Sequence, residues 1–292
     1  FFLAGVGVEV AERHKSTKVL TRILGFCQPK ERNMKTLSVT AKHMKLELNK
    51  IYCGDALEVL KSWPDEFVDC VVTSPPYNCG IEYDSWNDNM EWGDYYLWCE
   101  EWMREILRVL KKDGRFCLNH YLSLGQSENR HAPLMRLNEI ATGKIGFKHH
   151  GLAVWTDATL TKRTAWGSWK SASAPYINSP YEGILILYKQ NWKKEKMGKS
   201  TIDDKLFMKL TSGIWNMPAD HKRLTIATFP EELPAYCIQL LTYENDLILD
   251  PFMGSGTTAM AAKKLNRNYL GIKISKTYFK LAEKRLAQQL LL

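Results

Sequence analysis

The segment NDLILDPFMGSGTT (residues 245–258) constrains the fold more than any other part of the chain. Its apolar run predicts a buried strand that ends at Asp250, and a helix is expected from Thr257 or Thr258 onward. Gly254 and Gly256 let the backbone between them approach a ligand closely, as in nucleotide-type cofactor sites. The segment is neither a P-loop nor a GxGxxG motif, because no Gly-Lys-Ser/Thr and no third glycine follow. Alone, it could also be an ordinary tight strand-to-helix connection.

Elsewhere, short apolar runs alternate with stretches of helical periodicity. Strands are predicted within 48–53 and at 68–73, 115–120, 149–155, 184–189 and 269–274. Helices are predicted at 91–112, 228–241, 258–266 and 275–291. This alternation predicts an α/β fold, a mainly parallel twisted sheet with helices on both faces. Ligands bind such sheets at the carboxyl ends of the strands, where the strand order reverses.

Composition narrows the class of protein. Of the 292 residues, 45% are hydrophobic and 25% charged, which excludes a disordered or fibrous chain. No run of 18 apolar residues exists, and the opening residues 1–10 make a poor signal peptide, so we expect a cytoplasmic protein. Residues 1–45 are expected to form a partly disordered N-terminal extension before a domain at 46–292. The seven cysteines contain no CxxC pair, which indicates reduced thiols and no metal site.

A second motif, TSPPYN (73–78), directly follows the predicted strand at 68–73. Two successive prolines remove two backbone donors, so nearby carbonyls are left as acceptors at the strand end. An amino group lying flat against Tyr77 would meet the Ser74 hydroxyl and the Pro75 carbonyl. The motif therefore predicts a site for a planar base that carries an exocyclic amine, with a rigid Pro-Pro turn as the structural alternative.

Together, TSPPYN and DPFMGSGTT resemble the S-adenosylmethionine-dependent DNA amino-methyltransferases, in the β-type motif order. The resemblance covers about residues 46–287 and implies a Rossmann-like methyltransferase fold. It implies catalytic roles for Ser74, Pro75, Pro76 and Tyr77. It implies S-adenosylmethionine binding by Asp55, Thr228, Phe229, Pro230, Asp250, Phe252, Gly254, Gly256, Thr257 and the position of Lys273. The family usually has an acid at that last position, which accepts the ribose hydroxyls; Lys273 cannot accept them, at a cost of roughly 1.5–3 kcal/mol.

The implied reaction is methylation of the N4 amine of a cytosine flipped out of double-stranded DNA. Ser74 resembles the cytosine-N4 members, whereas adenine-N6 members mostly carry Asp there, and adenine N6 is the alternative target. The net charge of +8 suits a nucleic-acid partner. Target recognition is expected at about 156–183 and 190–226, with DNA contacts from Lys162, Arg163, Trp166, Trp169 and Lys170. The basic run at 193–199 is a second, weaker candidate. A cognate restriction endonuclease is a further expected partner.

Interpretations from other classes of protein stay open. Lys273 could suit the 2′-phosphate of an NADP-dependent oxidoreductase, although TSPPYN would then be unexplained. Alternatively, Lys273 could mark a catalytically impaired, DNA-binding homologue. An RNA substrate is also conceivable, because the pocket reads only a base.

Overall fold

The computed structural model describes residues 46–83, 85–125, 130–156, 167–177, 181–218 and 229–288, all within the unit Lys42–Leu292. Its strands are β1 (Lys50–Cys53), β2 (Val68–Thr73), β3 (Glu82–Tyr83), β4 (Trp86–Asn87), β5 (Leu110–Tyr121), β6 (Lys148–Thr156), β7 (Glu182–Tyr188), β8 (Ile214–Asn216), β9 (Leu247–Asp250) and β10 (Asn268–Lys273). Its helices are α1 (Ala56–Lys61), α2 (Trp92–Val109), α3 (Pro133–Glu139), the π-helix η1 (Ile140–Ile145), α4 (Asp204–Thr211), α5 (Glu232–Leu241), α6 (Thr257–Lys264) and α7 (Lys276–Gln288).

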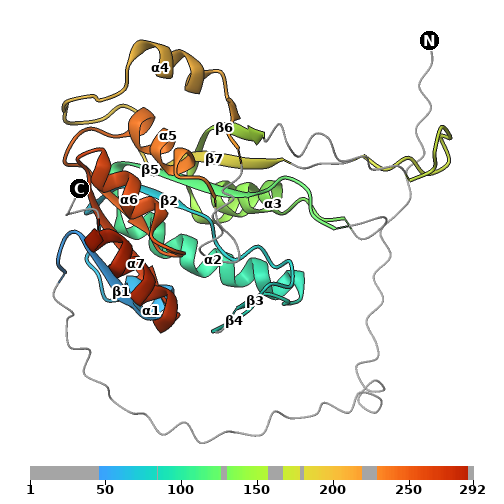
Figure 1. Ribbon diagram of the computed structural model, residues 1–292, viewed down its shortest axis with the longest axis horizontal. Coiled ribbons are helices and arrows are strands. Elements are labelled where there is room, and N and C mark those ends of the chain that lie inside the picture. Colours follow the sequence, from blue (N-terminus) through green and yellow to red (C-terminus); the bar gives the residue numbers. More distant parts are fainter. Residues whose placement is uncertain are drawn as a thin grey trace, which may run out of the picture. The chain divides into compact units, whose positions relative to one another are not determined.

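Eight strands form one sheet in the order β1-β10-β9-β2-β5-β7-β6-β8 (Figure 1). The first five run parallel, β7 is antiparallel to both of its neighbours, and β8 runs parallel to β6. This arrangement confirms the predicted mainly parallel sheet. Strand β8 comes from within the predicted insertion 190–226, so that part of the segment belongs to the sheet.

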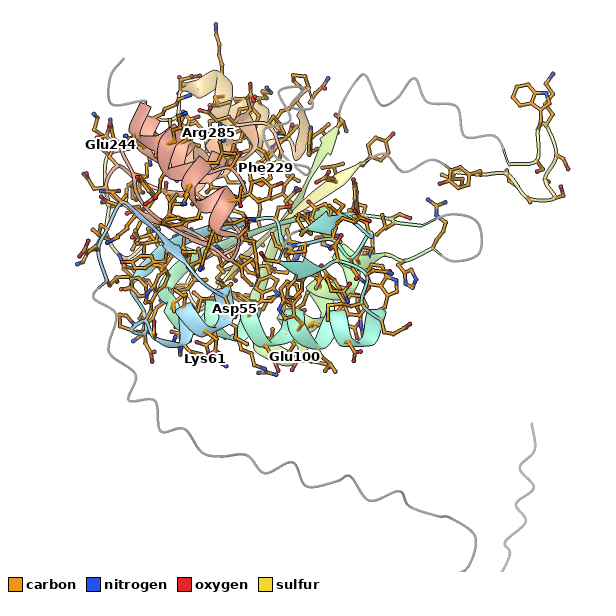
Figure 2. All side chains as sticks on the ribbon, turned by 60° about the horizontal axis from the view of Figure 1, so that its bottom comes forward. Asp55, Lys61, Glu100, Phe229, Glu244 and Arg285 are labelled. Carbon is orange, nitrogen blue, oxygen red and sulfur yellow. The ribbon has the colours of Figure 1, made fainter. Side chains whose placement is uncertain are left out.

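Alternating side chains of the strands fill two cores, one on each face of the sheet. In β9, Leu247 and Leu249 pack into the core covered by α1, α2 and α3, whereas Ile248 packs into the core under α5, α6 and α7. Lys61 and Glu100 lie on the outer side of the layer formed by α1 and α2 (Figure 2). Helices therefore cover both faces, as the alternation of elements predicts.

The strand order reverses between β9 and β2. From β2 the chain crosses through α2 to β5, and from β9 it crosses through α6 to β10, on the other side. The two crossover helices pack in different cores, so they cover opposite faces of the sheet. The loops after β2 and β9 thus diverge, which opens a crevice at the carboxyl ends of these strands. Both motifs identified in the sequence begin at this crevice.

Two regions differ from the sequence-based prediction. Helix α2 ends at Val109 instead of near residue 112, because Leu110 adopts an extended conformation and starts β5. Within β5, the pairing with β2 shifts register between Leu110 and Arg115, and a Cβ at Gly114 would lie 2.8 Å from a methyl group of Leu110. The stretch 121–147, where no element is predicted, contains α3 and η1, and Pro133 occupies the first turn of α3, where proline is favoured. No helix in the described ranges is long and apolar enough to cross a membrane.

Candidate functional site

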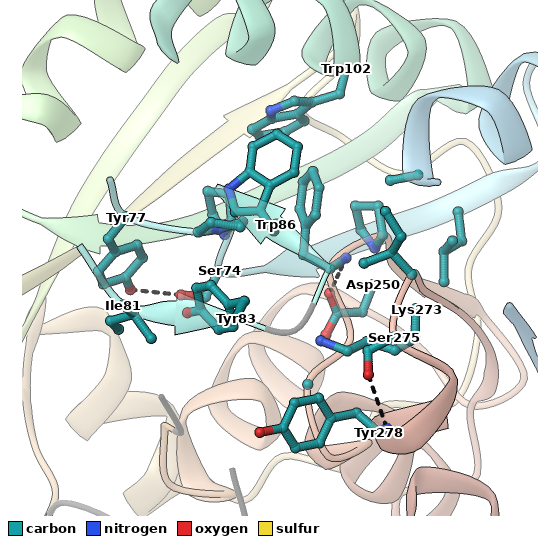
Figure 3. A pocket seen from close by; sticks show the side chains of 18 of the residues that line it. Ser74, Tyr77, Ile81, Tyr83, Trp86, Trp102, Asp250, Lys273, Ser275 and Tyr278 are labelled. Carbon is teal, nitrogen blue, oxygen red and sulfur yellow. Dashed lines mark hydrogen bonds between the residues drawn. The ribbon is translucent and has the colours of Figure 1, made fainter. Parts of the chain in front are cut away.

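The crevice at the switch point holds a cavity of about 440 Å³, a volume typical of small-molecule sites (Figure 3). It brings together most residues of the two sequence motifs. The predicted site residues that line it are Asp55, Ser74, Pro75, Pro76, Tyr77, Phe229, Asp250, Phe252, Gly254, Thr257 and Lys273. Pro230 and Gly256 do not line it, and Thr228 lies outside the described residues.

Ser74, Tyr77 and Glu182 form a chain of hydrogen bonds at one end of this cavity. The Ser74 hydroxyl donates to the Tyr77 oxygen over 2.6 Å, and the Tyr77 hydroxyl donates to Glu182 Oε2 over 2.8 Å (Figure 3 shows the first bond). Asn119 Nδ2 donates to both acceptors, the Tyr77 oxygen and Glu182 Oε2. Burial raises the pKa of Tyr77 well above its usual value and also raises the pKa of Glu182. Glu182 and Asn119 are not among the site residues predicted from the sequence.

The wall behind Tyr77 is neutral and rigid. Its ring stacks on His120 with centroids 4.1 Å apart, and burial lowers the pKa of His120 to about 3. The Tyr95 hydroxyl donates to the Pro76 carbonyl, so His120 Nε2, 3.0 Å from the same hydroxyl, carries the proton of the neutral ring. Among the described residues, none donates a hydrogen bond to the Pro75 carbonyl. That carbonyl and the Ser74 oxygen are left as acceptors.

Asp250 joins the two motifs. Its buried carboxylate accepts hydrogen bonds from Thr73 Oγ1 and Thr258 Oγ1, each 2.7 Å long, and from the backbone N–H of Phe252. Burial raises the pKa of Asp250, and these hydrogen bonds oppose that rise. Gly256, with φ of 89°, then turns the chain into α6. The glycine loop is therefore fixed to the end of β2.

Asp55 and Lys273 line the cavity from the ends of β1 and β10. Asp55 is the N-cap of α1: its Oδ1 accepts from the backbone N–H groups of Leu57 and Glu58 at 3.0 and 3.1 Å. Lys273 lies with its Nζ 5.1 Å from the centroid of the Tyr278 ring, and its charge opposes the rise that burial causes in the pKa of Asp250. The cavity therefore has a cation at the position where the resemblance implies an acid.

An aromatic wall closes the cavity beside α2. Trp86 of the β3–β4 hairpin packs against Trp98, which also contacts Phe252 of the glycine loop. The Trp86 Nε1 is buried and has no hydrogen-bond partner among the described residues. The sequence predicts a helix at 91–112, but no pattern in it distinguishes the aromatic residues that face the cavity.

The loop that carries Trp86 is held by one buried acid. The Asp88 carboxylate accepts hydrogen bonds from the backbone N–H groups of Asn78, Cys79 and Ile81. Asp88 is only 3% exposed, and these three donors compensate its burial. The hairpin is thereby fixed above the Pro-Pro-Tyr segment.

Of the predicted DNA contacts, the two that the structure describes, Trp169 and Lys170, do not line the cavity. Lys162, Arg163 and Trp166 fall outside the described residues. Trp169 and Lys170 lie in the segment 167–177, which is closed by a bridge between Gly167 and Pro175. Trp169 is 64% exposed, and the Lys170 ammonium lies 5.6 Å from its ring centroid.

In the basic run at 193–199, the second candidate for DNA contact, two of the lysines take part in ion pairs. Lys194 is nearly buried and pairs with Asp69 and Asp246, 3.5 and 3.2 Å away. Lys199 pairs with Glu244. Asp69 and Asp246 stand at the amino ends of β2 and β9, so Lys194 lies at the edge of the sheet opposite the cavity.

Comparison with known proteins gives consistent matches. The N6/N4 methyltransferase family model, described as DNA methylase, matches residues 68–284. The Type II methyltransferase M.MjaVI of Methanocaldococcus jannaschii is 40% identical over 161 residues, 55% of this chain and 81% of the relative. The Type II methyltransferase M.ScaI of Streptomyces caespitosus is 31% identical over 251 residues, 81% of this chain and 80% of the relative. TTHA0409 of Thermus thermophilus, a putative DNA modification methylase complexed with S-adenosyl-L-methionine, matches with a TM-score of 0.64 and 26% identity, covering 82% of this chain and 93% of that chain.

Proposed function

Because this chain belongs to the family of S-adenosylmethionine-dependent DNA amino-methyltransferases, we propose that it methylates the exocyclic N4 of a cytosine in double-stranded DNA. The observation that carries the proposal is the shared cavity: Ser74 and the glycine loop at Gly254 line the same space. An acceptor for an amine and a cofactor loop thereby face one cavity, as a direct transfer requires. The family matches give no support to an NADP-dependent oxidoreductase.

The cavity fits S-adenosylmethionine except at Lys273. Trp86 and Phe252 supply an apolar wall for a flat adenine ring, and the unpartnered Trp86 Nε1 supplies a donor. Asp55 caps α1 with Oδ1, and its Oδ2 would accept a hydrogen bond from the cofactor. Phe229 and Gly254 would hold the remainder of the cofactor. When bound, S-adenosylmethionine supplies a methyl group on a positively charged sulfur.

Ser74, Pro75 and Tyr77 would bind and orient the target base. The Ser74 oxygen and the Pro75 carbonyl would each accept an N–H of the exocyclic amine. These two bonds draw the amine nitrogen toward tetrahedral geometry and stabilise the positive charge that develops on it. The Tyr77 ring, already fixed by His120, would stack on the base and hold it in line for transfer.

The choice of cytosine over adenine depends on Ser74. In the resemblance, a serine at this position is typical of cytosine-N4 members, and adenine-N6 members mostly carry an aspartate. A neutral hydroxyl that already donates to Tyr77 presents an acceptor to the amine. Either base must leave the duplex to reach the cavity. Trp169 and Lys170 are proposed to contact the DNA through stacking and phosphate attraction.

The deciding experiment is chromatography of nucleosides from DNA treated with the protein and labelled S-adenosylmethionine. We expect labelled N4-methylcytosine, and labelled N6-methyladenine alone would refute the choice of base. Parallel reactions with duplex DNA and RNA of the same sequence test the nucleic-acid class, and label in RNA alone would refute a DNA substrate. Pairing with a cognate restriction endonuclease stays a prediction from the sequence.

A further inference from the structure

Methylation of an amine leaves a proton to be removed. The exocyclic nitrogen carries two N–H bonds, and forming the N–C bond while the S–C bond breaks gives it a positive charge. One N–H bond must then break to give the neutral methylamine, and the proton needs an acceptor. A base held in an enclosed cavity has limited contact with water, so a protein group is the nearest acceptor.

The described residues offer one carboxylate that is connected to the proposed position of the amine. Ser74 would touch the amine, its hydroxyl hydrogen points to the Tyr77 oxygen, and the Tyr77 hydrogen points to Glu182 Oε2. Each oxygen-to-oxygen distance, 2.6 and 2.8 Å, permits proton transfer along the bond. We propose that Glu182 takes up the proton of the methylated amine through the hydroxyl groups of Ser74 and Tyr77. This proposal rests on the proposed function.

The step balances without a co-reactant. The amine proton moves to the Ser74 oxygen, the Ser74 proton to the Tyr77 oxygen, and the Tyr77 proton to Glu182. One N–H bond breaks, one carboxyl O–H bond forms, both hydroxyls are regenerated, and nothing is oxidised or reduced. Glu182 does not touch the base, so it is a positioning residue that acts through Tyr77 and Ser74.

The surroundings of Glu182 favour this role over a purely structural one. It starts β7, where it faces Tyr121 of β5 and Trp155 of β6 across the sheet, and two donors already fix its Oε2. Burial raises its pKa, which brings the carboxylate closer to the neutral range where a proton acceptor works best. If the residue served only as an acceptor for Tyr77 and Asn119, it would need no charge. A glutamine would then serve without the free-energy cost of burying a carboxylate.

The other described titratable groups that face Glu182 do not replace it. Tyr77 and Cys79 come from the segment after β2, and His120 and Tyr121 come from β5. Burial raises the pKa of Cys79 to about 12, and His120, with a pKa of about 3, stays neutral. Among these groups, Glu182 is therefore the one whose protonation would give a rate–pH profile an acidic limb.

The test is single-turnover methylation of a duplex oligonucleotide between about pH 5 and 9, with saturating cofactor and DNA. Glu182→Gln keeps an acceptor for Tyr77 and Asn119 but cannot take a proton. Tyr77→Phe keeps the ring and breaks the relay. We expect each variant to slow the transfer by about 10²-fold or more. The wild-type rate should fall as the pH drops through the raised pKa of Glu182, and this limb should be missing in Glu182→Gln.

Two binding measurements separate the relay from a loss of structure. S-adenosylhomocysteine affinity and the 2-aminopurine fluorescence that reports base flipping should be unchanged in both variants. Glu195→Gln, an exposed site on the opposite edge of the sheet, is the matched control and should behave as wild type. A Glu182→Gln variant that keeps the wild-type rate and acidic limb, or loses binding in proportion to rate, overturns the relay. A wild-type protein that methylates neither DNA base overturns the proposed function instead.

Discussion

Lys273 ends β10, and its positive charge opposes the rise that burial causes in the pKa of the Asp250 carboxyl. It lines the cavity where the family resemblance implies a carboxylate that accepts ribose hydroxyls. An ammonium group has three hydrogen-bond donors and no acceptor, so it cannot replace a carboxylate at this position. Cofactor affinity is therefore the property in which this chain should differ most from relatives with an acid there.

Lys273→Glu should tighten S-adenosylhomocysteine binding by about ten- to a hundredfold, because a charge-assisted acceptor is restored. Isothermal titration calorimetry measures the change. Lys276→Glu makes the same change of charge at an exposed position on α7 and serves as the control. Equal affinities of the two variants would contradict a missing acceptor at position 273.

Glu182 also affects stability. Its pKa is raised by burial in the folded protein, so folding is favoured when the group is protonated and this contribution is lost as the pH rises through the folded pKa. Glu182→Gln removes the buried charge, and the variant should have a higher Tm than wild type at about pH 8. The difference should shrink as the pH falls through the raised pKa of Glu182, because the wild-type carboxyl then binds its proton. Thermal unfolding followed by circular dichroism tests this, and a pH-independent difference would contradict it.

Among the elements, α1 couples local stability to the cofactor cavity through Asp55. One carboxylate oxygen caps the helix, while the residue also lines the cavity. Asp55→Ser should keep the cap and weaken S-adenosylhomocysteine binding, because a hydroxyl has no second acceptor oxygen to offer the ligand. Asp55→Ala should weaken binding and also lower the unfolding free energy by about 1 kcal/mol. Denaturant unfolding and calorimetry on both variants separate the effects, and equal stability of the two would show that the cap is unimportant.

Most elements could be predicted from the sequence, because a parallel sheet buries its strands as short apolar runs. Strand β2 begins and ends where the run Val68–Thr73 does. The acid of the hydrogen-bond chain could not be predicted. Glu182 lies 105 positions from Tyr77, and only the antiparallel pairing of β7 with β5 places it beside that ring. Long-range register is set by the assembled sheet and leaves no local pattern in the sequence.

At the scale of the whole molecule, the carboxyl and amino ends of the strands differ in function: one forms the cavity and the other carries stabilising ion pairs. The carboxyl edge carries the cavity and its buried polar groups. The amino edge carries ion pairs: Lys194 lies between Asp69 and Asp246, with about nine-tenths of its side chain buried. These pairs join the starts of β2 and β9, the strands on either side of the switch point. The ion pairs at the amino edge therefore fix β2 and β9 relative to each other. The same two strands position the cavity at the carboxyl edge.

Lys194→Met should lower the unfolding free energy by roughly 3 kcal/mol, because two largely buried carboxylates lose a shared cation while Lys111 still pairs with Asp69. The rate of methyl transfer per folded molecule should not change, since the site lies at the other edge. Chemical denaturation and single-turnover kinetics measure the two properties. Lys193→Met, at an exposed neighbouring position, is the control and should affect neither.

Strand β1 has β10 as its neighbour in the described sheet, and Tyr269 donates to Asn49 across 220 positions of the chain. A ribosome therefore releases β1 and Asp55 long before the strand that holds them in place. A nascent polypeptide could expose its Pro-Pro-Tyr segment early, but the cofactor chamber closes only after β10 emerges. Translation products that stop short of this strand should deposit no methyl marks on the genome.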